Sequence, residues 1–208
     1  MKFEPGQMDM IMRLRSRGIS DTSVLRAMET VSRRHFVDPD LHHKVYDDLT
    51  LPIACGQVLP MPLTTAIMTQ VLNVEARHKV LEIGSGSGYH SALLATLSKR
   101  VYGVERYKTL VKSSEARFQR LGIVNVVIRH GDGRYGWAGQ APFDRIVVGC
   151  SVLSVPDKLM EQLAPGGVLV AVVDGQLTRL TKARSRITEE AVMPLNLPVM
   201  EAGKSKAL

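Results

Sequence analysis

Hydrophobic and polar positions in the second half of the chain alternate between two patterns. Short apolar runs of strand length recur, and most are followed by apolar positions at the three- and four-residue spacing of a helix. The strand-like runs occupy residues 80–83, 100–104, 124–129, 143–149 and 168–173, and the helical spacing occupies residues 91–95, 110–121 and 156–163. This alternation predicts right-handed crossovers and a mostly parallel, doubly wound sheet with helices on both faces, which is a Rossmann-like α/β fold.

The chain before residue 79 predicts a helical extension of this core. Apolar spacing over residues 7–31 fits two short amphipathic helices, which Gly18 separates, with Ser20 or Asp21 as the cap of the second. Residues 36–62 are rich in proline and glycine, as loops are, and helical spacing resumes at residue 64.

The last forty residues predict a change of direction. The Pro-Gly-Gly sequence at residues 165–167 is expected to stop the preceding helix, and Asp174-Gly175 is typical of a hairpin. Residues 176–184 and 190–200 lack helical periodicity and are expected to form antiparallel strands. The tail at residues 203–208 is expected to be frayed.

Length and composition indicate one globular domain with an extension. The chain has 208 residues, of which 45% are hydrophobic and 23% charged, without the composition of a disordered protein. No apolar run approaches the roughly 18 residues of a membrane span, and the N-terminus lacks the apolar core of a signal peptide. We therefore expect a cytoplasmic protein with no membrane partner.

Charge and metal-ligating residues narrow the partners only slightly. The formal net charge of +7 favours acidic partners in general, but no continuous basic stripe indicates nucleic acid. Cys55 and Cys150 are far apart and fit neither a disulfide framework nor a zinc site, so they are expected to be free thiols. The histidines at residues 42–43 and the aspartates at residues 47–48 could be drawn as a metal cluster, but adjacent histidines point apart, and no metal is expected. The sequence does not fix the oligomeric state.

A glycine-rich stretch supplies the candidate chemistry. The strand-like run ending at Ile83 continues as Gly84-Ser85-Gly86-Ser87-Gly88 and then enters helical sequence. Glycines permit positive φ and a close approach of the backbone to a ligand, while the first free amides of the helix point at that ligand. The stretch is typical of a loop that binds a nucleotide-type cofactor.

Three further groups are expected beside this loop. Glu105 ends the next strand about twenty residues later, where an acid can accept hydrogen bonds from the two hydroxyls of a ribose. Asp132-Gly133 follows the third strand-like run, and Gly149-Cys150-Ser151 ends the fourth. Ligands of open α/β sheets bind outside the carboxyl ends of the strands, so all four features are expected at one site.

Glu82 favours one cofactor over another. The loop lacks the later glycine of the dinucleotide fingerprint, and a carboxylate two residues before the loop would repel a pyrophosphate. The same carboxylate suits the amino and sulfonium cations of S-adenosylmethionine, so the charges favour this cofactor over NAD. The alternative is that Glu82 merely accepts hydrogen bonds from local backbone amides.

The motifs together resemble one family, the protein-L-isoaspartate (D-aspartate) O-methyltransferases, which are class I S-adenosylmethionine methyltransferases. The resemblance runs from about Met8 to about Met200. The matching stretches are Arg17–Asp21, Val24–Met28, Arg33–Val37, Leu51–Ile53, Glu82–Tyr89, Val104–Arg106, Gly131–Gly133 with Gly136-Trp137, Ala141–Asp144 and Leu163–Gly167. The N-terminal stretches and Leu51–Ile53 make it specific, because they are not general features of S-adenosylmethionine enzymes.

The resemblance implies a role for each matched position. It implies that the glycine-loop residues hold the methionine part of the cofactor, that Glu105 holds the ribose and that Asp132 and Gly133 flank the adenine. The implied cofactor-binding residues are Glu82, Gly84, Ser85, Gly86, Gly88, Glu105, Arg106, Asp132 and Gly133. The implied substrate-binding residues, which would accept an extended isoaspartyl peptide, are Ile53, Ala54, Cys55, Gly56, Gln57, Gly149, Cys150 and Ser151. The implied catalytic positions are Ile53, Gln57 and Pro60.

The substrate loop departs from the family pattern. The family typically has Gly-Gln-Thr-Ile-Ser-x-Pro, whereas this chain has Val58 and Pro60 in place of the two hydroxyl residues. The usual Thr-Ala-Ala after the fourth strand is here Gly-Cys-Ser at residues 149–151. Ser151, Thr64 or Thr65 could supply a substitute hydroxyl, although helix capping is the ordinary role of such residues.

We expect the loss of these hydroxyls to slow or redirect methyl transfer rather than abolish it. A substrate carboxylate with a pKa near roughly 4 is ionised at neutral pH and needs no general base. Positioning can supply about 7 to 11 kcal/mol, whereas one hydrogen bond to a charged group contributes about 1.5 to 3 kcal/mol.

The sequence therefore predicts an enzyme that methylates isoaspartyl residues of damaged proteins. The resemblance implies that the ester then cyclises to a succinimide, which reopens partly to normal aspartate. One compact unit is expected, with N-terminal helices and the substrate loop in residues 1–78 packed on a cofactor-binding domain in residues 79–208. Two alternatives stay open: a methyltransferase of the same fold with a changed substrate, such as a small carboxylate or RNA, and a non-catalytic protein that binds S-adenosylmethionine or peptide.

Overall fold

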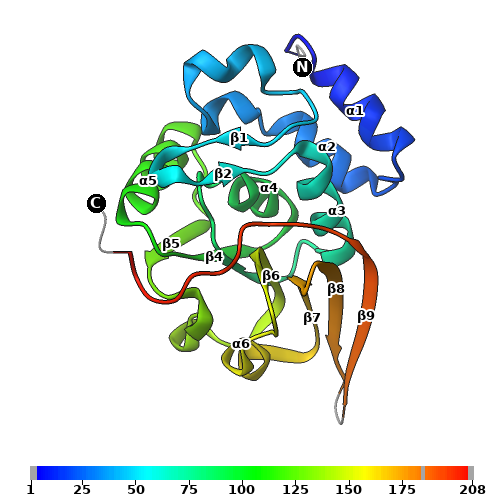
Figure 1. The fold of residues 1–208 in the computed structure, drawn as a ribbon, viewed down its shortest axis with the longest axis vertical. Coiled ribbons are helices and arrows are strands. Elements are labelled where there is room, and N and C mark those ends of the chain that lie inside the picture. The colour runs from blue at the N-terminus through cyan, green and yellow to red at the C-terminus, as the bar shows by residue number, and fades with distance from the viewer. Residues whose placement is uncertain (1–3, 184–185, 206–208) are drawn as a thin grey trace.

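The computed structural model describes residues 4–183 and 186–205, and its centre is a seven-stranded sheet (Figure 1). The strand order is β5-β4-β3-β6-β7-β8-β9. Neighbouring strands from β5 to β7 are parallel, and β8 and β9 are antiparallel, as predicted. The strands are β3 (Lys79–Ile83), β4 (Arg100–Glu105), β5 (Val126–His130), β6 (Phe143–Val152), β7 (Leu163–Val173), β8 (Gln176–Lys182) and β9 (Ile187–Pro194).

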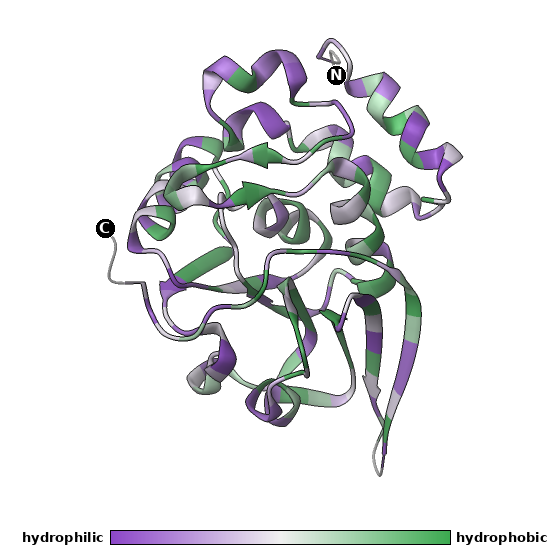
Figure 2. Ribbon diagram, in the orientation of Figure 1, coloured by the Kyte–Doolittle hydropathy of each residue, from purple (hydrophilic) through white to green (hydrophobic). Residues whose placement is uncertain are grey.

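Helices cover both faces of the sheet, which confirms the doubly wound fold. They are α1 (Gln7–Ser16), α2 (Thr22–Thr30), α3 (Pro62–Leu72), α4 (Tyr89–Leu97), α5 (Lys108–Leu121) and α6 (Asp157–Gln162). Alternation along β3 divides the core between the two faces. Val80 packs with residues of α3 and α4, whereas Leu81 and Ile83 pack with α6 on the other face. Figure 2 shows hydrophobic residues along the central strands and mixed hydropathy along the outer helices.

The N-terminal extension packs on the α4 side of the core. Helices α1 and α2 share a hydrophobic cluster with α4 and α5, in which Phe36 contacts the ring of Tyr89 edge to face. Asp21 caps α2, because its carboxylate accepts from the backbone amides of Ser23 and Val24 at 2.8 and 3.3 Å. The cluster contains residues from both sides of the predicted boundary between residues 78 and 79. The division of the chain at that point stays a prediction.

The substrate loop is more ordered than the sequence predicts. It forms a small antiparallel sheet of β1 (Leu51–Pro52) and β2 (Val58–Leu59), joined by a 3₁₀ turn at Ala54–Gly56. Helix α3 begins at Pro62, two residues before the predicted start, because a proline at the first helical position already has the φ of a helix.

The predicted stop at residues 165–167 is wrong in detail. Helix α6 ends at Gln162, and β7 begins at once at Leu163. The turn lies inside β7 as an irregularity, since Phe143 pairs with Leu163 and Arg145 pairs with Val168. Gly166 takes a φ of +78° there, a backbone conformation that glycine adopts without strain.

The C-terminal predictions need correction too. Strand β9 ends at Pro194, and residues 195–205 cross back over the carboxyl ends of the parallel strands (Figure 1). The backbone of Ser151 donates to Pro198 and accepts from Met200, both at 2.8 Å. The amide of Gly203 donates to Asp132 at 2.9 Å, so residues 203–205 are not frayed. Prolines cannot donate to a sheet ladder, which explains why the strand does not continue to residue 200. Residues 184 and 206–208 lie outside the described residues.

Within the described ranges, no helix has the length and hydropathy needed to cross a bilayer.

Candidate active site

A cavity of about 420 Å³ opens at the carboxyl ends of β3, β4 and β6. The strand order reverses here, because the chain runs outward from β3 to β5 and then returns to β6 on the other side of β3. The substrate loop, α3 and the C-terminal segment complete the walls. The cavity therefore lies where an open α/β sheet binds its ligand.

The glycine loop forms the floor of this cavity. Gly84, Gly86 and Gly88 all have positive φ, at 77°, 55° and 87°, which confirms the predicted use of glycine. A Cβ on Gly88 would lie 2.7 Å from the Phe118 ring and 3.0 Å from Ser114 Cβ. Helix α4 starts at Tyr89 without a side-chain cap, so its first amides are free for a ligand.

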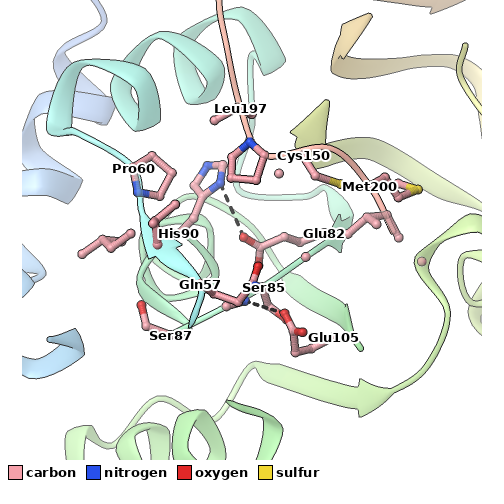
Figure 3. Close-up of a pocket in the computed structure, with 18 of the residues that line it drawn as sticks. Gln57, Pro60, Glu82, Ser85, Ser87, His90, Glu105, Cys150, Leu197 and Met200 are labelled. Atoms are coloured by element: carbon pink, nitrogen blue, oxygen red, sulfur yellow. Dashed lines mark hydrogen bonds and ion pairs between the residues drawn. The ribbon is translucent and has the colours of Figure 1, made fainter. Parts of the chain in front are cut away.

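Glu105 holds the loop from the adjacent strand. Its side chain is 4% exposed, and its two oxygens accept from the backbone amides of Gly86 and Tyr107, each at 2.9 Å. Figure 3 shows it at the opposite end of the cavity from Pro60. These two amides fix the carboxylate at the end of β4, where a ribose would need an acceptor.

Two hydroxyls of the loop are left without partners. Ser85 and Ser87 line the cavity, and their Oγ atoms are buried without a hydrogen-bond partner among the described residues. Buried hydroxyls in folded proteins are almost always hydrogen-bonded, so a polar ligand in the cavity is their natural partner. With the free amides of α4 and the Glu105 carboxylate, they fit a ligand with amino-acid and ribose groups.

Glu82 points to the α4 face of β3 because side chains alternate along a strand. It is 2% exposed, accepts from Ser91 Oγ and lies 3.5 Å from His90 Nδ1 (Figure 3). Burial raises the pKa of Glu82 from 4.5 to about 8, the Ser91 hydrogen bond lowers it, and the charge of Glu105 raises it. Its observed partner is thus a hydroxyl side chain rather than a local amide.

His90 is neutral beside it. Burial lowers the pKa of His90 from 6.5 to about 4, and Nε2 lies 3.0 Å from Thr69 Oγ1. A cation that enters the cavity therefore meets a buried carboxyl group with no charged partner, and it favours the ionised form of that group.

Replacing Glu82 by glutamine is expected to remove a pH dependence of stability. The folded state binds the extra proton of Glu82 between pH 4.5 and about 8, so this contribution is complete below pH 4.5 and disappears as the pH rises to about 8. Between pH 6 and pH 9 the wild type should lose roughly 2 to 3 kcal/mol of unfolding free energy relative to E82Q. Urea denaturation without cofactor at both pH values measures this, and parallel pH profiles of the two proteins would contradict it.

The substrate loop reaches the cavity through only some of its predicted residues. Gly56, Gln57 and Pro60 line it, and Gln57 Nε2 donates to Tyr107 Oη at 3.3 Å. Ile53 lies against the glycine loop, since a Cβ on Gly86 would be 3.5 Å from its Cδ1.

A fully buried arginine fixes this loop from behind. Arg33 Nη2 donates to the Pro60 carbonyl at 3.1 Å, and Arg33 Nε donates to the Val45 carbonyl at 2.8 Å.

Two predicted substrate residues of the loop, Ala54 and Cys55, are not among the residues that line the cavity.

Comparison with known proteins agrees with this geometry. Residues 6–200 match the family model described as protein-L-isoaspartate(D-aspartate) O-methyltransferase. The chain belongs to this family.

Named relatives cover almost the whole chain. A protein-L-isoaspartate O-methyltransferase of Maricaulis maris is 44% identical over 99% of this chain and 98% of its own length. One of Xanthobacter autotrophicus is 44% identical over 97% and 94%. A solved structure of a putative protein-L-isoaspartate O-methyltransferase from Plasmodium falciparum, in complex with S-adenosyl-L-homocysteine, superposes with a TM-score of 0.82. It is 26% identical, and the match covers 95% of this chain and 99% of that one.

Glycine and cysteine at the end of β6 differ in their surroundings. A Cβ on Gly149 would lie 3.1 Å from the carbonyl oxygens of Ile83 and Gly84, so a side chain there would have to move β6 and the cofactor loop apart by a few tenths of an ångström. Burial and the charge of Glu105 raise the pKa of Cys150 to about 12, so its thiol is not a nucleophile at neutral pH. Gly149 and Cys150 line the cavity, and Ser151 does not.

The predicted adenine end is partly closed by the protein itself. Gly133 lines the cavity, but the Asp132 carboxylate accepts from Arg134 and from the amide of Gly203. Arg106 lines the cavity, pairs with Glu201 and donates to the Gly203 carbonyl at 3.3 Å.

The sequence did not predict one wall of the cavity. Residues 197–201 line it, and so does Tyr107. The prolines at positions 194 and 198 were the available signal, because they exclude a regular strand over residues 190–200.

The histidines and aspartates drawn as a possible metal cluster have other partners. His42 Nε2 lies 3.0 Å from the Arg34 carbonyl, and Asp48 pairs with Arg17. Over residues 4–183 and 186–205, no three His, Cys, Asp or Glu side chains are grouped to hold a metal ion.

Proposed function

We propose that this protein transfers a methyl group from S-adenosyl-L-methionine to the free carboxylate of isoaspartyl residues in damaged proteins. The match to the family model over residues 6–200 carries the proposal. The cavity supports it, because its free helix amides, unpartnered serine hydroxyls and fixed carboxylate suit an amino-acid nucleoside.

We assign the cofactor to the floor of the cavity. Gly84, Ser85 and Gly86 hold the amino-acid part, Gly88 packs on α5 outside the cavity lining, and the free amides of α4 face the ligand carboxylate. Glu105 accepts from the ribose hydroxyls, and Gly133 borders the adenine. Asp132 and Arg106 support this end through their hydrogen bonds to Gly203.

Glu82 belongs to the cationic end of the same ligand. Its buried carboxyl has no fixed cation, so an ammonium or sulfonium group stabilises its ionised form and lowers its pKa. When bound, S-adenosylmethionine supplies an electrophilic methyl group: a carboxylate oxygen bonds to the methyl carbon, the carbon–sulfur bond breaks, and its electron pair stays on sulfur.

The protein contributes positioning rather than proton transfer. An isoaspartyl carboxylate is ionised at neutral pH, so the reaction needs no general base. The substrate loop, held by Arg33 through the Pro60 carbonyl, and the C-terminal segment at residues 197–201 enclose the cavity. Correct alignment in such an enclosure can supply about 7 to 11 kcal/mol, several times the contribution of one hydroxyl.

Methylation of a matched pair of peptides tests the proposal. Radiolabelled S-adenosylmethionine is incubated with the protein and either an isoaspartyl peptide or its aspartyl twin. We expect label in the isoaspartyl peptide alone, as a base-labile ester. Equal labelling of both peptides, salt-sensitive labelling of RNA, or cofactor binding by calorimetry with no transfer would contradict it.

A further inference from the structure

Two threonines on the first turn of α3 lie inside the active-site cavity. Thr64 is 4% exposed and Thr65 is 3% exposed, and both line the cavity with Pro60. Neither hydroxyl has a hydrogen-bond partner among the described residues, although the Thr65 carbonyl accepts from Thr69. The residues are almost buried, but neither hydroxyl oxygen is among the fully buried unpartnered atoms, so both keep accessible surface and can bond to a ligand in the cavity.

Neither threonine acts as the helix cap that its sequence position suggests. The N-cap of α3 is Met61, which gives no side-chain hydrogen bond, and Pro62 is the first helical residue. The first amides of this 11-residue helix therefore have no side-chain acceptor, and they favour negative charge at the same end of the cavity.

The charged groups around the cavity leave few ways to hold a carboxylate. Arg106 is paired with Glu201, and His90 is neutral. Among the described residues, no other arginine, lysine or histidine lines the cavity. An acceptor carboxylate must therefore be held by neutral donors.

We propose that Thr64 and Thr65 donate the hydrogen bonds that orient the isoaspartyl carboxylate for methylation, in place of the hydroxyls that Val58 and Pro60 lack. This assignment rests on the proposed function. It moves the donors from the loop to a helix, four and five residues beyond Pro60, where the backbone is held by its own hydrogen bonds.

Threonine-to-valine variants test the assignment, because valine keeps the branched shape and removes only the hydroxyl. We expect T64V and T65V each to lower kcat/KM for an isoaspartyl peptide about tenfold to one-hundredfold. The serine variants T64S and T65S should recover most of the wild-type value. S-adenosylhomocysteine affinity, measured by calorimetry, should stay within about twofold of the wild type, since the cofactor lies on the glycine loop.

A binding measurement separates carboxylate recognition from a general packing defect. In the presence of S-adenosylhomocysteine, the wild type should bind the isoaspartyl peptide more tightly than a twin with a carboxamide in place of the free carboxylate. The valine variants should reduce this difference. T178V is the matched control, because Thr178 is 2% exposed, lies on β8 and already donates to the Gln176 carbonyl at 3.1 Å.

The outcomes distinguish this inference from the proposed function. A wild type that does not discriminate between isoaspartyl and aspartyl peptides refutes the proposed function itself. If the wild type discriminates, wild-type kinetics in T64V/T65V refute the role of the threonines alone. Equal losses in the valine and serine variants, or a loss of cofactor affinity as large as the loss of kcat/KM, would also overturn it.

Discussion

Replacing Glu105 by alanine is expected to weaken binding of S-adenosylhomocysteine by about 10²- to 10⁴-fold. The range corresponds to two hydrogen bonds from ribose hydroxyls to a charged acceptor, each about 1.5 to 3 kcal/mol. The same carboxylate accepts from the amides of Gly86 and Tyr107, so the variant also releases the glycine loop. Isothermal calorimetry with the purified protein measures the affinity.

Two further variants show whether the charge or merely the side chain is needed. E105Q keeps one acceptor oxygen and should fall between the wild type and E105A. E115A removes a carboxylate from an exposed position on α5 and should bind like the wild type. An E105A protein that is folded and binds with wild-type affinity would refute the assignment of Glu105 to the ribose.

Replacing Gly88 by alanine is expected to lower the free energy of unfolding by about 2 to 5 kcal/mol. The backbone φ of +87° costs about 1 to 2 kcal/mol for an L-residue with a side chain. The new Cβ would also lie 2.7 Å from the Phe118 ring, and such overpacking costs about 1 to 3 kcal/mol. Urea denaturation at fixed pH measures the difference.

Gly18 provides the control that separates these two costs. Its φ is +92°, but a Cβ there would have nothing within 4 Å, so G18A should lose only the backbone part, about 1 to 2 kcal/mol. If G88A loses no more unfolding free energy than G18A, the Phe118 ring moves aside at little cost. The close packing of the loop on α5 is then not the reason for glycine at this position.

Most elements of the fold can be predicted from local patterns in the sequence. The short apolar run around Leu81, helical spacing on both sides of the loop and the Asp174-Gly175 hairpin predict the strands, helices and turns that the structure contains. The glycine loop and Glu105 were predictable for the same reason, because each lies at the junction between a strand and its following loop. The predictions failed where glycine and proline signals competed, as at residues 165–167, which form a bulge within β7 instead of ending a helix.

The acceptor side of the site depended on tertiary packing. Thr64 and Thr65 look like ordinary helix-cap residues in sequence, and only the packing of α3 against β6 and β7 places them in the cavity without hydrogen-bond partners. They differ from capping threonines because their hydroxyls lack hydrogen-bond partners within the protein, and no local sequence pattern shows this.

By itself, the sequence determined the strands of the sheet, the cofactor loop and the family of this protein, because each of these follows from short stretches of residues that are adjacent along the chain. Only the tertiary structure decided what closes the cavity. Ser151 bonds to Pro198 and Met200, Arg106 pairs with Glu201, and Asp132 accepts from Gly203. These partners are about fifty to one hundred residues apart along the chain. These residues come into contact because of the order of the strands in the sheet. Such long-range contacts produce no periodic pattern in the sequence.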